Sequence, residues 1–384
     1  MECDRLGAVA AQRRQRQQGV PDRGGEISMT PFENLEYAGR QGARVAWYMG
    51  HYFASRRFRA AKPAQERKTG GKGPGRKFIF EQMGELFARD LANVAKGYYP
   101  MPRDRDGTLR DIIATSRRYF ADLPLAAERK AQGQGAEVYS PELAEKFPAY
   151  FLQNFHFQTG GYLTEESAKL YDMQVEVLFS GTANAMRRQC LVPIAEFLRN
   201  KDQRHLALLD VACGTGRFAR LAKQAFPRLA ITGCDLSEAY LDEARDHLRP
   251  YKAEFKAGQA EALPFADASF AIVTSIFLFH EVPPMVRRSI AREFARVLKP
   301  GGLLVFMDSL QPGDMPEVDA MLEAFPTNFH EPYYPSYLRE DLKAIFSEAG
   351  FEDVAAEPVF LSKRVTAKKP QAPYLAVSEK GGAG

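Results

Sequence analysis

Hydrophobic and polar positions change their spacing near residue 205, and this change divides the chain into two regions. Beyond residue 205, short apolar runs of strand length alternate with amphipathic stretches of helix length. Strands are expected at residues 206–211, 229–234, 254–257, 270–275, 303–308 and 356–365, and helices at 217–225, 237–248, 287–298 and 337–349. This alternation predicts an α/β fold with a doubly wound, Rossmann-like parallel sheet.

The region before residue 205 has the apolar spacing of helices. Helices are expected at residues 34–60, 79–96, 108–120, 141–150 and 164–200. Residues 1–28 hold few apolar side chains, which predicts a disordered tail, and glycine and proline interrupt residues 62–77, which predicts a linker. We therefore expect a tail over residues 1–29, a mostly α-helical cap domain over 30–200 and the α/β domain over 201–384.

Composition and length exclude several classes of protein. The 384 residues are 45% hydrophobic and 26% charged, as in an ordinary globular protein, and no apolar run approaches the ~20 residues of a membrane span. The four cysteines form no Cys-x-x-Cys pair and no Cys/His cluster with zinc-ligand spacing, so no metal site is predicted. Arginines interrupt the N-terminal region, which argues against a secretion signal. A cytoplasmic protein is expected.

The first third of the chain is basic, and this charge has two interpretations. Residues 1–130 hold 25 Lys and Arg against 15 Asp and Glu, a surplus that could bind nucleic acid or an anionic membrane. A true basic arm, however, has runs of about five or six like charges, and this region has none. A solvated helical surface is therefore favoured, and nucleic acid is not expected as a partner.

The strongest chemical pattern lies at the end of the first predicted strand, in the run Asp210-Val-Ala-Cys-Gly214-Thr-Gly216. Two glycines at a strand-to-helix turn allow a ligand to approach the backbone closely, and the helix N-terminus that follows favours an anion. Asp235 ends the second predicted strand, 19 residues after Gly216. An acid at that position can accept hydrogen bonds from a ribose.

Two cofactors fit this pattern. Gly214-x-Gly216-x-x-Ala219 formally matches the dinucleotide fingerprint, in which a pyrophosphate lies on the helix N-terminus. Asp210, however, would repel a pyrophosphate, whereas its charge suits an ammonium group. S-adenosylmethionine has an amino group, a carboxylate and a ribose, which match Asp210, the glycine turn and Asp235 in that order.

Four ordered motifs resemble those of class I S-adenosylmethionine-dependent methyltransferases, and the set is similar to the ubiquinone/menaquinone biosynthesis subfamily. They are Leu209–Gly216, Gly233–Ser237, Gly258–Phe265 with Ser269-Phe270, and Leu298–Gly302. The resemblance covers about residues 200–310 and implies a seven-stranded core with S-adenosylmethionine as the cofactor. It places the following residues in the cofactor site: Asp210, Ala212, Gly214, Gly216, Asp235, Leu236, Gln259, Ala260 and Ser275.

The residues that follow the fourth predicted strand bear on the acceptor. Thr274 to Pro284 is apolar and aromatic with one imidazole, and it lacks the Asp/Asn-Pro-Pro-aromatic motif of methyltransferases that act on nucleobase amines. A small, rather apolar acceptor is favoured. His280 is the candidate general base, because its unperturbed pKa lies near neutrality; an imidazole that caps the next helix or packs against the strand is the alternative.

Aromatic segments outside the motifs are expected near the acceptor. Polar and aromatic residues alternate in Tyr150–Tyr162. This segment could fold over the cofactor and supply His156 and Tyr162 to the reaction, or it could form a helix with an aromatic core face. Further residues are expected to line the acceptor pocket: Tyr171, Asp172, His330, Tyr333, Tyr334 and Tyr337.

The motifs together predict in-line methyl transfer from S-adenosylmethionine to a small hydrophobic or aromatic acceptor. Two alternatives stay open. Gln259 and Ala271 replace the family's usual aspartates, which permits a non-catalytic, cofactor-binding regulator. The basic first third permits an RNA methyltransferase. A small-molecule acceptor is the expected partner, and a homodimer is one option for the assembly.

Overall fold

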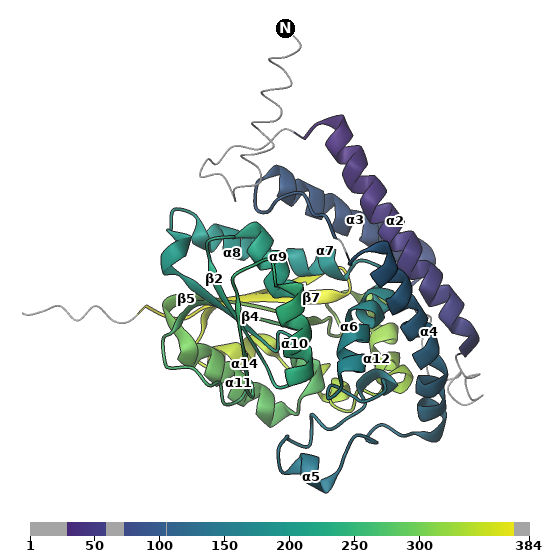
Figure 1. Cartoon of the computed structure of the whole chain (residues 1–384). Helices are drawn as coiled ribbons and strands as arrows, with labels where there is room; N and C mark the ends of the chain where they lie inside the picture. The colour runs from purple at the N-terminus through teal and green to yellow at the C-terminus, as the bar shows by residue number, and fades with distance from the viewer. Residues whose placement is uncertain (1–28, 59–72, 105, 372–384) are drawn as a thin grey trace, which may run out of the picture.

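The computed structural model describes residues 29–58, 73–104 and 106–371. Within these residues, seven strands form one sheet in the order β3-β2-β1-β4-β5-β7-β6, with β7 antiparallel to both its neighbours (Figure 1). The strands are β1 (Ala207–Val211), β2 (Ala230–Asp235), β3 (Glu254–Ala257), β4 (Phe270–Ile276), β5 (Leu298–Ser309), β6 (Glu352–Val359) and β7 (Ser362–Lys368). The predicted seven-stranded, doubly wound α/β core is confirmed.

Helices cover both faces of the sheet, as buried parallel strands require (Figure 1). One face is covered by α7 (Ala183–Arg188), α8 (Leu191–Leu198) and α9 (Arg217–Ala225), and the other by α11 (Pro284–Val297) and α14 (Leu342–Glu348). A further helix of this unit, α10 (Glu238–His247), packs beside β2 and β3.

The central strands are apolar along most of their length because their successive side chains enter two different cores. Leu208 of β1 and Ile272 of β4 belong to the core under α7, α8 and α9. Leu209 and Val273, the next residues along, belong to the core under α11 and α14. This two-sided burial fixes the register that brings the carboxyl ends of β1 and β4 together.

Two elements predicted near the C-terminal end are wrong in detail. The strand expected at 356–365 is a hairpin of β6 and β7, and Phe360 lies at the reversal with a positive φ of 55°. No Asn-Gly or similar pair marks this turn, so the apolar pattern continues through it. The helix expected at 337–349 is two helices, α13 (Tyr334–Tyr337) and α14, because Asp341 caps α14 by accepting backbone hydrogen bonds.

The region before residue 205 is helical, as predicted. Its helices are α2 (Pro31–Ser55), α3 (Arg76–Ala95), α4 (Leu109–Gln132), α5 (Pro141–Ala144) and α6 (Glu165–Leu178). The side chains of Thr30, Thr108 and Thr164 cap α2, α4 and α6. The single helix expected at 164–200 is α6, α7 and α8, because Ser180 and Gly181 adopt positive φ angles after α6. The predicted tail and most of the predicted linker lie outside the described residues.

Short elements complete the structure. Turns of 3₁₀ helix are η1 (Arg56–Phe58), η2 (Phe155–Phe157), η3 (Gln203–His205), η4 (Phe279–Glu281) and η5 (Pro316–Val318), and α12 (Asp319–Asn328) follows η5. In the part of the chain that the structure describes, no helix combines the length and the apolarity that crossing a membrane requires.

Helix α2 points its polar side chains inward and its apolar side chains outward, the reverse of an ordinary surface helix. Its buried residues are Tyr37, Gln41, Arg44, Tyr48, His51 and Ser55. Its outward residues include Phe32, Leu35, Trp47 and Phe53, which are 65%, 71%, 40% and 46% exposed. The inward polar groups are accommodated by partners of opposite charge on neighbouring elements.

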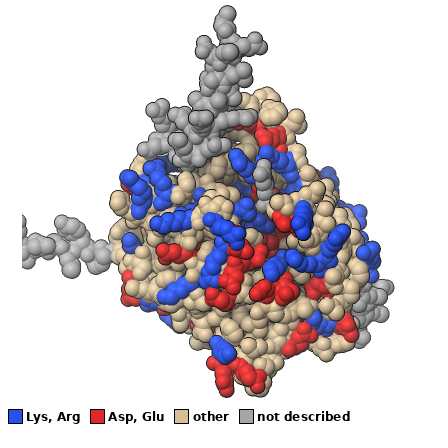
Figure 2. Space-filling model, viewed as in Figure 1, with Lys and Arg blue, Asp and Glu red and all other residues tan. Residues whose placement is uncertain are grey.

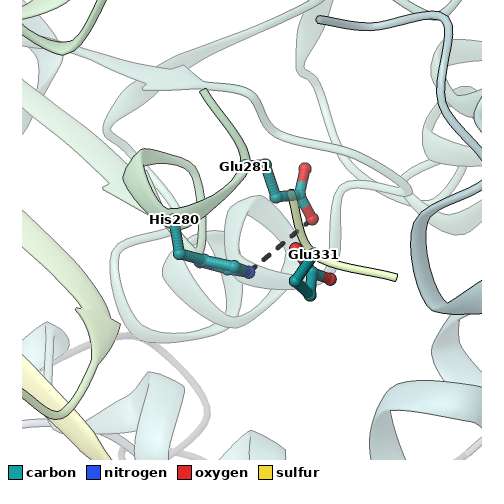
Figure 3. A group of neighbouring side chains, drawn as sticks. All are labelled: His280, Glu281 and Glu331. Carbon is teal, nitrogen blue, oxygen red and sulfur yellow. Dashed lines mark ion pairs between the residues drawn. The ribbon is translucent and has the colours of Figure 1, made fainter. Parts of the chain in front are cut away.

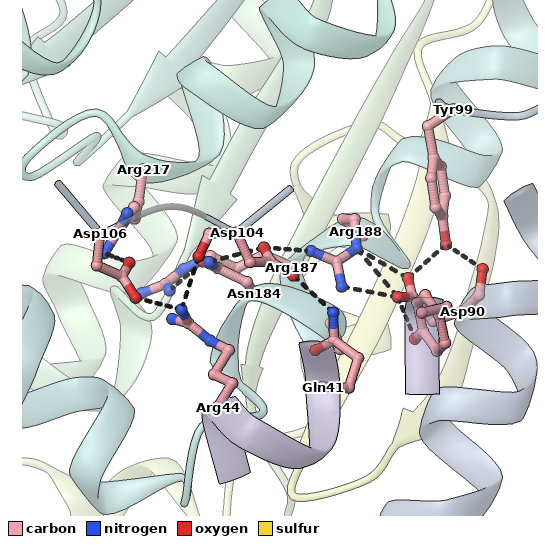
Figure 4. Close-up of polar contacts among 12 residues, drawn as sticks. Gln41, Arg44, Asp90, Tyr99, Asp104, Asp106, Asn184, Arg187, Arg188 and Arg217 are labelled. Carbon is pink, nitrogen blue, oxygen red and sulfur yellow. Dashed lines mark hydrogen bonds and ion pairs between the residues drawn. The ribbon is translucent and has the colours of Figure 1, made fainter. Parts of the chain in front are cut away.

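These partners form a buried ion-pair network, which we call the cap–sheet network (Figure 4). Arg188 of α7 contacts Asp90 of α3 and Asp104, each at 2.7 Å. Tyr37 of α2 and Tyr99 also donate hydrogen bonds to Asp90, at 2.6 and 2.8 Å. Because a buried carboxylate is costly without partners, this geometry fixes α2 and α3 against α7.

The same network reaches the helix that begins at the glycine turn. Arg217, the first residue of α9, contacts Asp106 at 2.7 Å and Asp172 of α6 at 3.0 Å. Arg44 of α2 pairs with Asp106 and, at 2.7 Å, with Glu176 of α6. The cap helices therefore contact α9 directly through charged groups.

Apolar packing across residue 200 is continuous as well. Leu86 of α3 and Met186 of α7 share one hydrophobic cluster with Leu208 of β1 and Phe218 of α9. The domain boundary at residue 200 stays a prediction, and α7 and α8 pack on the sheet itself.

Candidate active site

A cavity opens at the carboxyl ends of β1, β2 and β4, where ligands bind in doubly wound sheets. It encloses about 760 Å³, part of it open to solvent. Seven of its 18 lining residues are aromatic: Tyr150, Phe151, Phe155, Tyr162, Tyr171, Tyr240 and Phe277. Two carboxylates, Asp235 and Glu281, also line it. The cavity can therefore hold a largely apolar ligand that has polar groups at defined points.

Asp235 connects the two loops that bound the cavity. Its Oδ2 accepts a hydrogen bond from the Gly214 N–H at 2.8 Å, and its Oδ1 accepts one from the Ser237 N–H at 2.9 Å. A Cβ on Gly214 would lie 4.0 Å from the rings of Tyr171 and Tyr240. The glycine turn thus lies directly beneath aromatic side chains, and Asp235 holds it in place.

Asp210 is buried at the end of β1 with one oxygen unpartnered. Its Oδ1 accepts a hydrogen bond from the Thr274 hydroxyl at 2.7 Å, whereas its Oδ2 has no hydrogen-bond donor. Burial raises the pKa of Asp210 to about 7. A positively charged ligand group would supply the missing donor and favour the ionised carboxylate.

The structure brings some of the predicted cofactor residues to the cavity wall and leaves the others behind it. On the wall are Ala212, Gly214, Asp235, Leu236 and Ala260. Not on the wall are Asp210, Gly216, Gln259 and Ser275. Gly216 is needed for packing, since a Cβ there would lie 2.8 Å from Leu248 and 3.0 Å from Ala244 of α10. The Ser275 hydroxyl is buried without a hydrogen-bond partner.

Two residues of the wall hold a backbone conformation that side chains disfavour. Ala212 follows β1 with a φ of 54°, and Phe277 follows β4 with a φ of 63°. Such conformations cost roughly 1–3 kcal/mol and tend to occur at functional sites. The sequence predicts Ala212 at this site but not Phe277, because nothing in an apolar run marks a residue with a left-handed backbone conformation.

The segment Tyr150–Tyr162 folds over the cavity, as one of its two interpretations predicted, and it consists of turns and η2 rather than a long helix. The Tyr150 hydroxyl donates a hydrogen bond to Glu261 Oε1 at 2.6 Å, and the Ser237 hydroxyl donates one to the Tyr162 carbonyl at 2.5 Å. The Tyr162 ring stacks on Phe155 at 5.4 Å. These contacts attach the segment to the loops after β2 and β3.

His280 lies beside the cavity, and one of its ring nitrogens is hydrogen-bonded to Asp308. Asp308 Oδ1 accepts a hydrogen bond from His280 Nδ1 at 2.6 Å, and Asp308 Oδ2 accepts backbone hydrogen bonds from Leu278 and Phe279. Figure 3 shows the opposite edge of the ring pointing toward Glu281 and Glu331. There, His280 Nε2 lies 3.8 Å from Glu281 Oε1.

The two glutamates come from separate segments. Glu281 is on the cavity wall, where its Oε1 accepts a hydrogen bond from the Tyr162 hydroxyl at 2.6 Å. Glu331 lies between α12 and α13, and its side chain is fully buried. Its Oε1 lies 2.9 Å from His156 Nε2 but accepts no hydrogen bond, and its Oε2 has no hydrogen-bond partner. We call His280, Glu281, Glu331 and the supporting Asp308 the acidic cluster.

Burial and charge shift the pKa values of this cluster. Burial lowers the pKa of His280, but the carboxylates around it, led by Asp308, outweigh that effect and raise the pKa to about 10. Burial also raises the pKa of Glu281 to about 8. Both shifts favour the protonated forms of His280 and Glu281 near neutral pH.

The residues expected in an acceptor pocket separate into three groups. Tyr171 lines the cavity. Asp172 does not line it; it pairs with Arg217 and accepts a hydrogen bond from Thr215. Burial alone would raise the pKa of Asp172, but the charge of Arg217 outweighs burial and lowers the pKa below its usual value. The others surround the acidic cluster or lie farther out, namely His330, Tyr333, Tyr334 and Tyr337.

Of that last group, two tyrosines pack against His280. The rings of Tyr334 and Tyr337 lie 5.9 and 6.3 Å from the imidazole. His330 instead hydrogen-bonds Gln153 at 2.9 Å, and the Tyr333 carbonyl accepts a hydrogen bond from Arg287 at 2.9 Å. His156 contacts Glu331, as described, so it meets the acidic cluster from the folded-over segment.

The carboxylates of the acidic cluster were not predicted from the sequence. Glu281 directly follows His280, which was a usable signal, but Asp308 and Glu331 lie 28 and 51 residues beyond His280. Only the pairing of β4 with β5 brings Asp308 beside it.

Comparison with known proteins places these features among methyltransferases. Residues 208–302 match a family model described as a methyltransferase domain. A demethylmenaquinone methyltransferase of Thermotoga maritima is 34% identical over 221 residues, which is 52% of this chain and 90% of that protein. A ubiquinone/menaquinone biosynthesis C-methyltransferase of Desulfotalea psychrophila is 38% identical over 105 residues, which is 27% of this chain and 42% of that protein.

Among solved structures, a Haemonchus contortus phosphoethanolamine N-methyltransferase in complex with phosphomonomethylethanolamine and S-adenosylhomocysteine is similar to this chain. It has a TM-score of 0.39 and 20% identity, with 48% of this chain and 53% of that chain covered.

Proposed function

Because the chain belongs to the class I S-adenosylmethionine-dependent methyltransferases of the ubiquinone/menaquinone biosynthesis type, we propose that it methylates a small aromatic acceptor. The observation that carries this proposal is the aromatic cavity at the strand ends, with Asp235 and Glu281 on its wall. The relatives' names point to reduced quinones as the first acceptors to test.

The residues present fit the cofactor. The unpartnered Oδ2 of Asp210 would accept a hydrogen bond from its amino group, and the backbone N–H groups at the start of α9 would bind its carboxylate. Asp235 would accept hydrogen bonds from the ribose, and Ala260 would contact the adenine. When bound, the cofactor supplies a methyl group that its sulfonium has already activated.

The chain itself must align the acceptor and exclude water from the reacting atoms. Phe151, Phe155 and Phe277 provide apolar walls, and Tyr162 closes one side, fixed by its stacking on Phe155 and its hydrogen bond to Glu281. In-line transfer needs no further group from the protein unless the acceptor retains a proton.

A base role for His280 stays a prediction. Glu281, and not His280, lines the cavity, so an acceptor proton would reach the imidazole only through Glu281. Methyl transfer by His280→Gln at the wild-type rate would dismiss the role.

The test uses methyl-labelled S-adenosylmethionine with demethylmenaquinol and with fractionated cell extract. We expect label in a lipid-soluble aromatic product, and no cofactor binding by Asp235→Ala in calorimetry. Cofactor binding without transfer to any fraction would instead support a regulatory protein, and label in RNA would support an RNA methyltransferase. On the face shown in Figure 2, acidic side chains lie among the basic ones, which does not favour RNA.

A homodimer through α2 is also part of our proposal. Gly39, Gly42 and Gly50 meet no atom within 4 Å of an added Cβ, although each glycine costs a helix about 1 kcal/mol relative to alanine. In an antiparallel pair of α2 helices centred between Gly42 and Ala43, Leu35 would face Gly50 and Trp47 would face Ala38. Leu35 and Trp47 would then meet small residues near the centre of the contact, and Phe32 would meet Phe53 at its ends.

The area is sufficient for a modest dimer. Three half-exposed aromatic rings supply roughly 300 Å² per copy, and Leu35 with the small residues roughly doubles this. Two copies would then bury about 1,200 Å², the lower range of specific interfaces.

A further inference from the structure

The structure assigns a second ligand to the active site: we propose that His280, Glu281 and Glu331 bind a divalent first-row transition metal ion beside the acceptor. One imidazole nitrogen and one oxygen from each carboxylate lie within 4.8 Å of one another (Figure 3). Around a single ion with ligand distances of about 2.1 Å, such atoms lie about 3.4 Å apart. The present spacing, including the 3.8 Å between His280 Nε2 and Glu281 Oε1, requires only small side-chain movements.

The support behind His280 is an independent observation. Histidines that bind metals generally donate their other ring N–H to a carboxylate, which fixes the tautomer and directs the lone pair at the ion. Asp308 accepts this hydrogen bond at 2.6 Å and is itself held by the backbone N–H groups of Leu278, Phe279 and Ser309. The arrangement therefore directs Nε2 at the two glutamates.

Glu331 provides a further observation, because it is a buried carboxylate without a sufficient partner. Its side chain has no solvent exposure, its Oε2 has no contact with a donor, and its Oε1 meets only His156 without hydrogen-bond geometry. A buried carboxylate is normally paired or bound to a metal. Among the residues described, no Lys or Arg forms an ion pair with Glu281, Glu331 or Asp308.

The mixture of donors selects the class of ion. Two carboxylate oxygens with one imidazole suit Mn²⁺, Fe²⁺, Co²⁺ or Zn²⁺, whereas Ca²⁺ and Mg²⁺ prefer oxygen donors alone. Three protein ligands leave coordination positions open. Because Glu281 lies on the cavity wall, an open position faces the acceptor, where a phenolate oxygen of the acceptor would complete the shell. This role rests on the proposed function, but binding of the ion does not.

The test measures metal binding by the full chain after dialysis against EDTA. Mn²⁺ is titrated and followed by the loss of the free-ion EPR signal, and Co²⁺ is followed by its visible absorption. We expect one ion per chain for the wild type. His280→Gln and Glu331→Gln should weaken binding at least 100-fold, and Asp308→Asn should weaken it 10- to 100-fold.

Matched controls use exposed residues of the same type, His205→Gln and Glu348→Gln, which should bind the ion like the wild type. Circular dichroism and thermal unfolding show that each variant is folded, and binding of S-adenosylmethionine is measured separately by calorimetry. The proposal is overturned if the folded wild type binds neither Mn²⁺ nor Co²⁺, or if binding survives both ligand substitutions. A protein that binds the ion but not the cofactor would overturn the proposed function and leave the metal site intact.

Discussion

The two buried groups of charged side chains in this protein differ in how their charges are balanced. In the cap–sheet network, Asp90, Asp104 and Asp106 each lie 2.7 Å from a guanidinium nitrogen. In the acidic cluster, the carboxylates meet imidazoles instead. A guanidinium is always charged in a protein, whereas an imidazole is not. The three aspartates of the network are therefore paired with permanent cations without a ligand, whereas the carboxylates of the acidic cluster have only imidazoles as partners.

The largest effect should come from breaking the cap–sheet network. Arg188→Met leaves Asp90 and Asp104 without their shared guanidinium, and we expect the free energy of unfolding to fall by about 3–5 kcal/mol. Urea denaturation measures the loss. Arg204→Met removes an exposed pair with Asp202 and should change the free energy of unfolding far less, because solvent screens exposed charges. Equal losses in the two variants would show that the network does not carry this stability.

The next effect concerns Asp210, the unpaired carboxylate of the cofactor site. Its pKa of about 7 means that it takes up a proton as pH falls, and only the ionised form attracts an amino group. Cofactor affinity should therefore fall about tenfold for each unit of pH below 7. Calorimetry from pH 8 to pH 5.5 measures this slope. Asp210→Asn should bind weakly at every pH without the slope; a wild-type affinity that does not change with pH would contradict the assignment.

A smaller effect, of opposite sign to that of Arg188→Met, is expected in the acidic cluster. In EDTA, Glu331→Gln replaces a buried carboxyl group, whose oxygens accept no hydrogen bond, with a neutral amide, and the free energy of unfolding should rise by about 1 kcal/mol. Asp104→Asn is the matched change in the cap–sheet network and should lower the free energy of unfolding. Thermal and urea unfolding of both variants make the comparison, and destabilisation by Glu331→Gln would mean that the cluster is already balanced.

The smallest effect on unfolding should come from the outward face of α2. Leu35→Arg changes an exposed residue, so it should alter the free energy of unfolding by no more than about 0.5 kcal/mol. Its effect on assembly should be complete, because two arginines would meet small residues across the pair. Light scattering should give the mass of two chains for the wild type and of one for the variant. A single-chain wild type would rule out the dimer.

How far the sequence predicts the structure depends on the range of the interaction involved. The glycine turn and Asp235 were found because a strand, a turn and an acid at the end of the next strand lie close in sequence. The hairpin at Phe360 was not predicted, because the residue that adopts the left-handed conformation at this turn is a phenylalanine and not a glycine. Asp172 was expected near the acceptor, but its partner Arg217 belongs to α9, which sequence alone does not place beside α6.

The acidic cluster shows the same limit more strongly. His280 was identified from its local surroundings, and its role as a base was inferred from an unperturbed imidazole. The surroundings that change this inference are Asp308 and Glu331, which come from β5 and from the loop after α12. Spacing rules for metal sites detect ligands on one short segment, so they do not detect a set assembled from two.

The position of Arg217 limits how this chain can be recombined with others. This arginine is the first residue after the glycine turn, and it contacts Asp106 and Asp172 on two cap segments. A chimera that joined this sheet unit to a relative's cap would leave the guanidinium buried beside the cofactor loop without its acids. Exchange of caps should therefore succeed only when Arg217, Asp106 and Asp172 are transferred together.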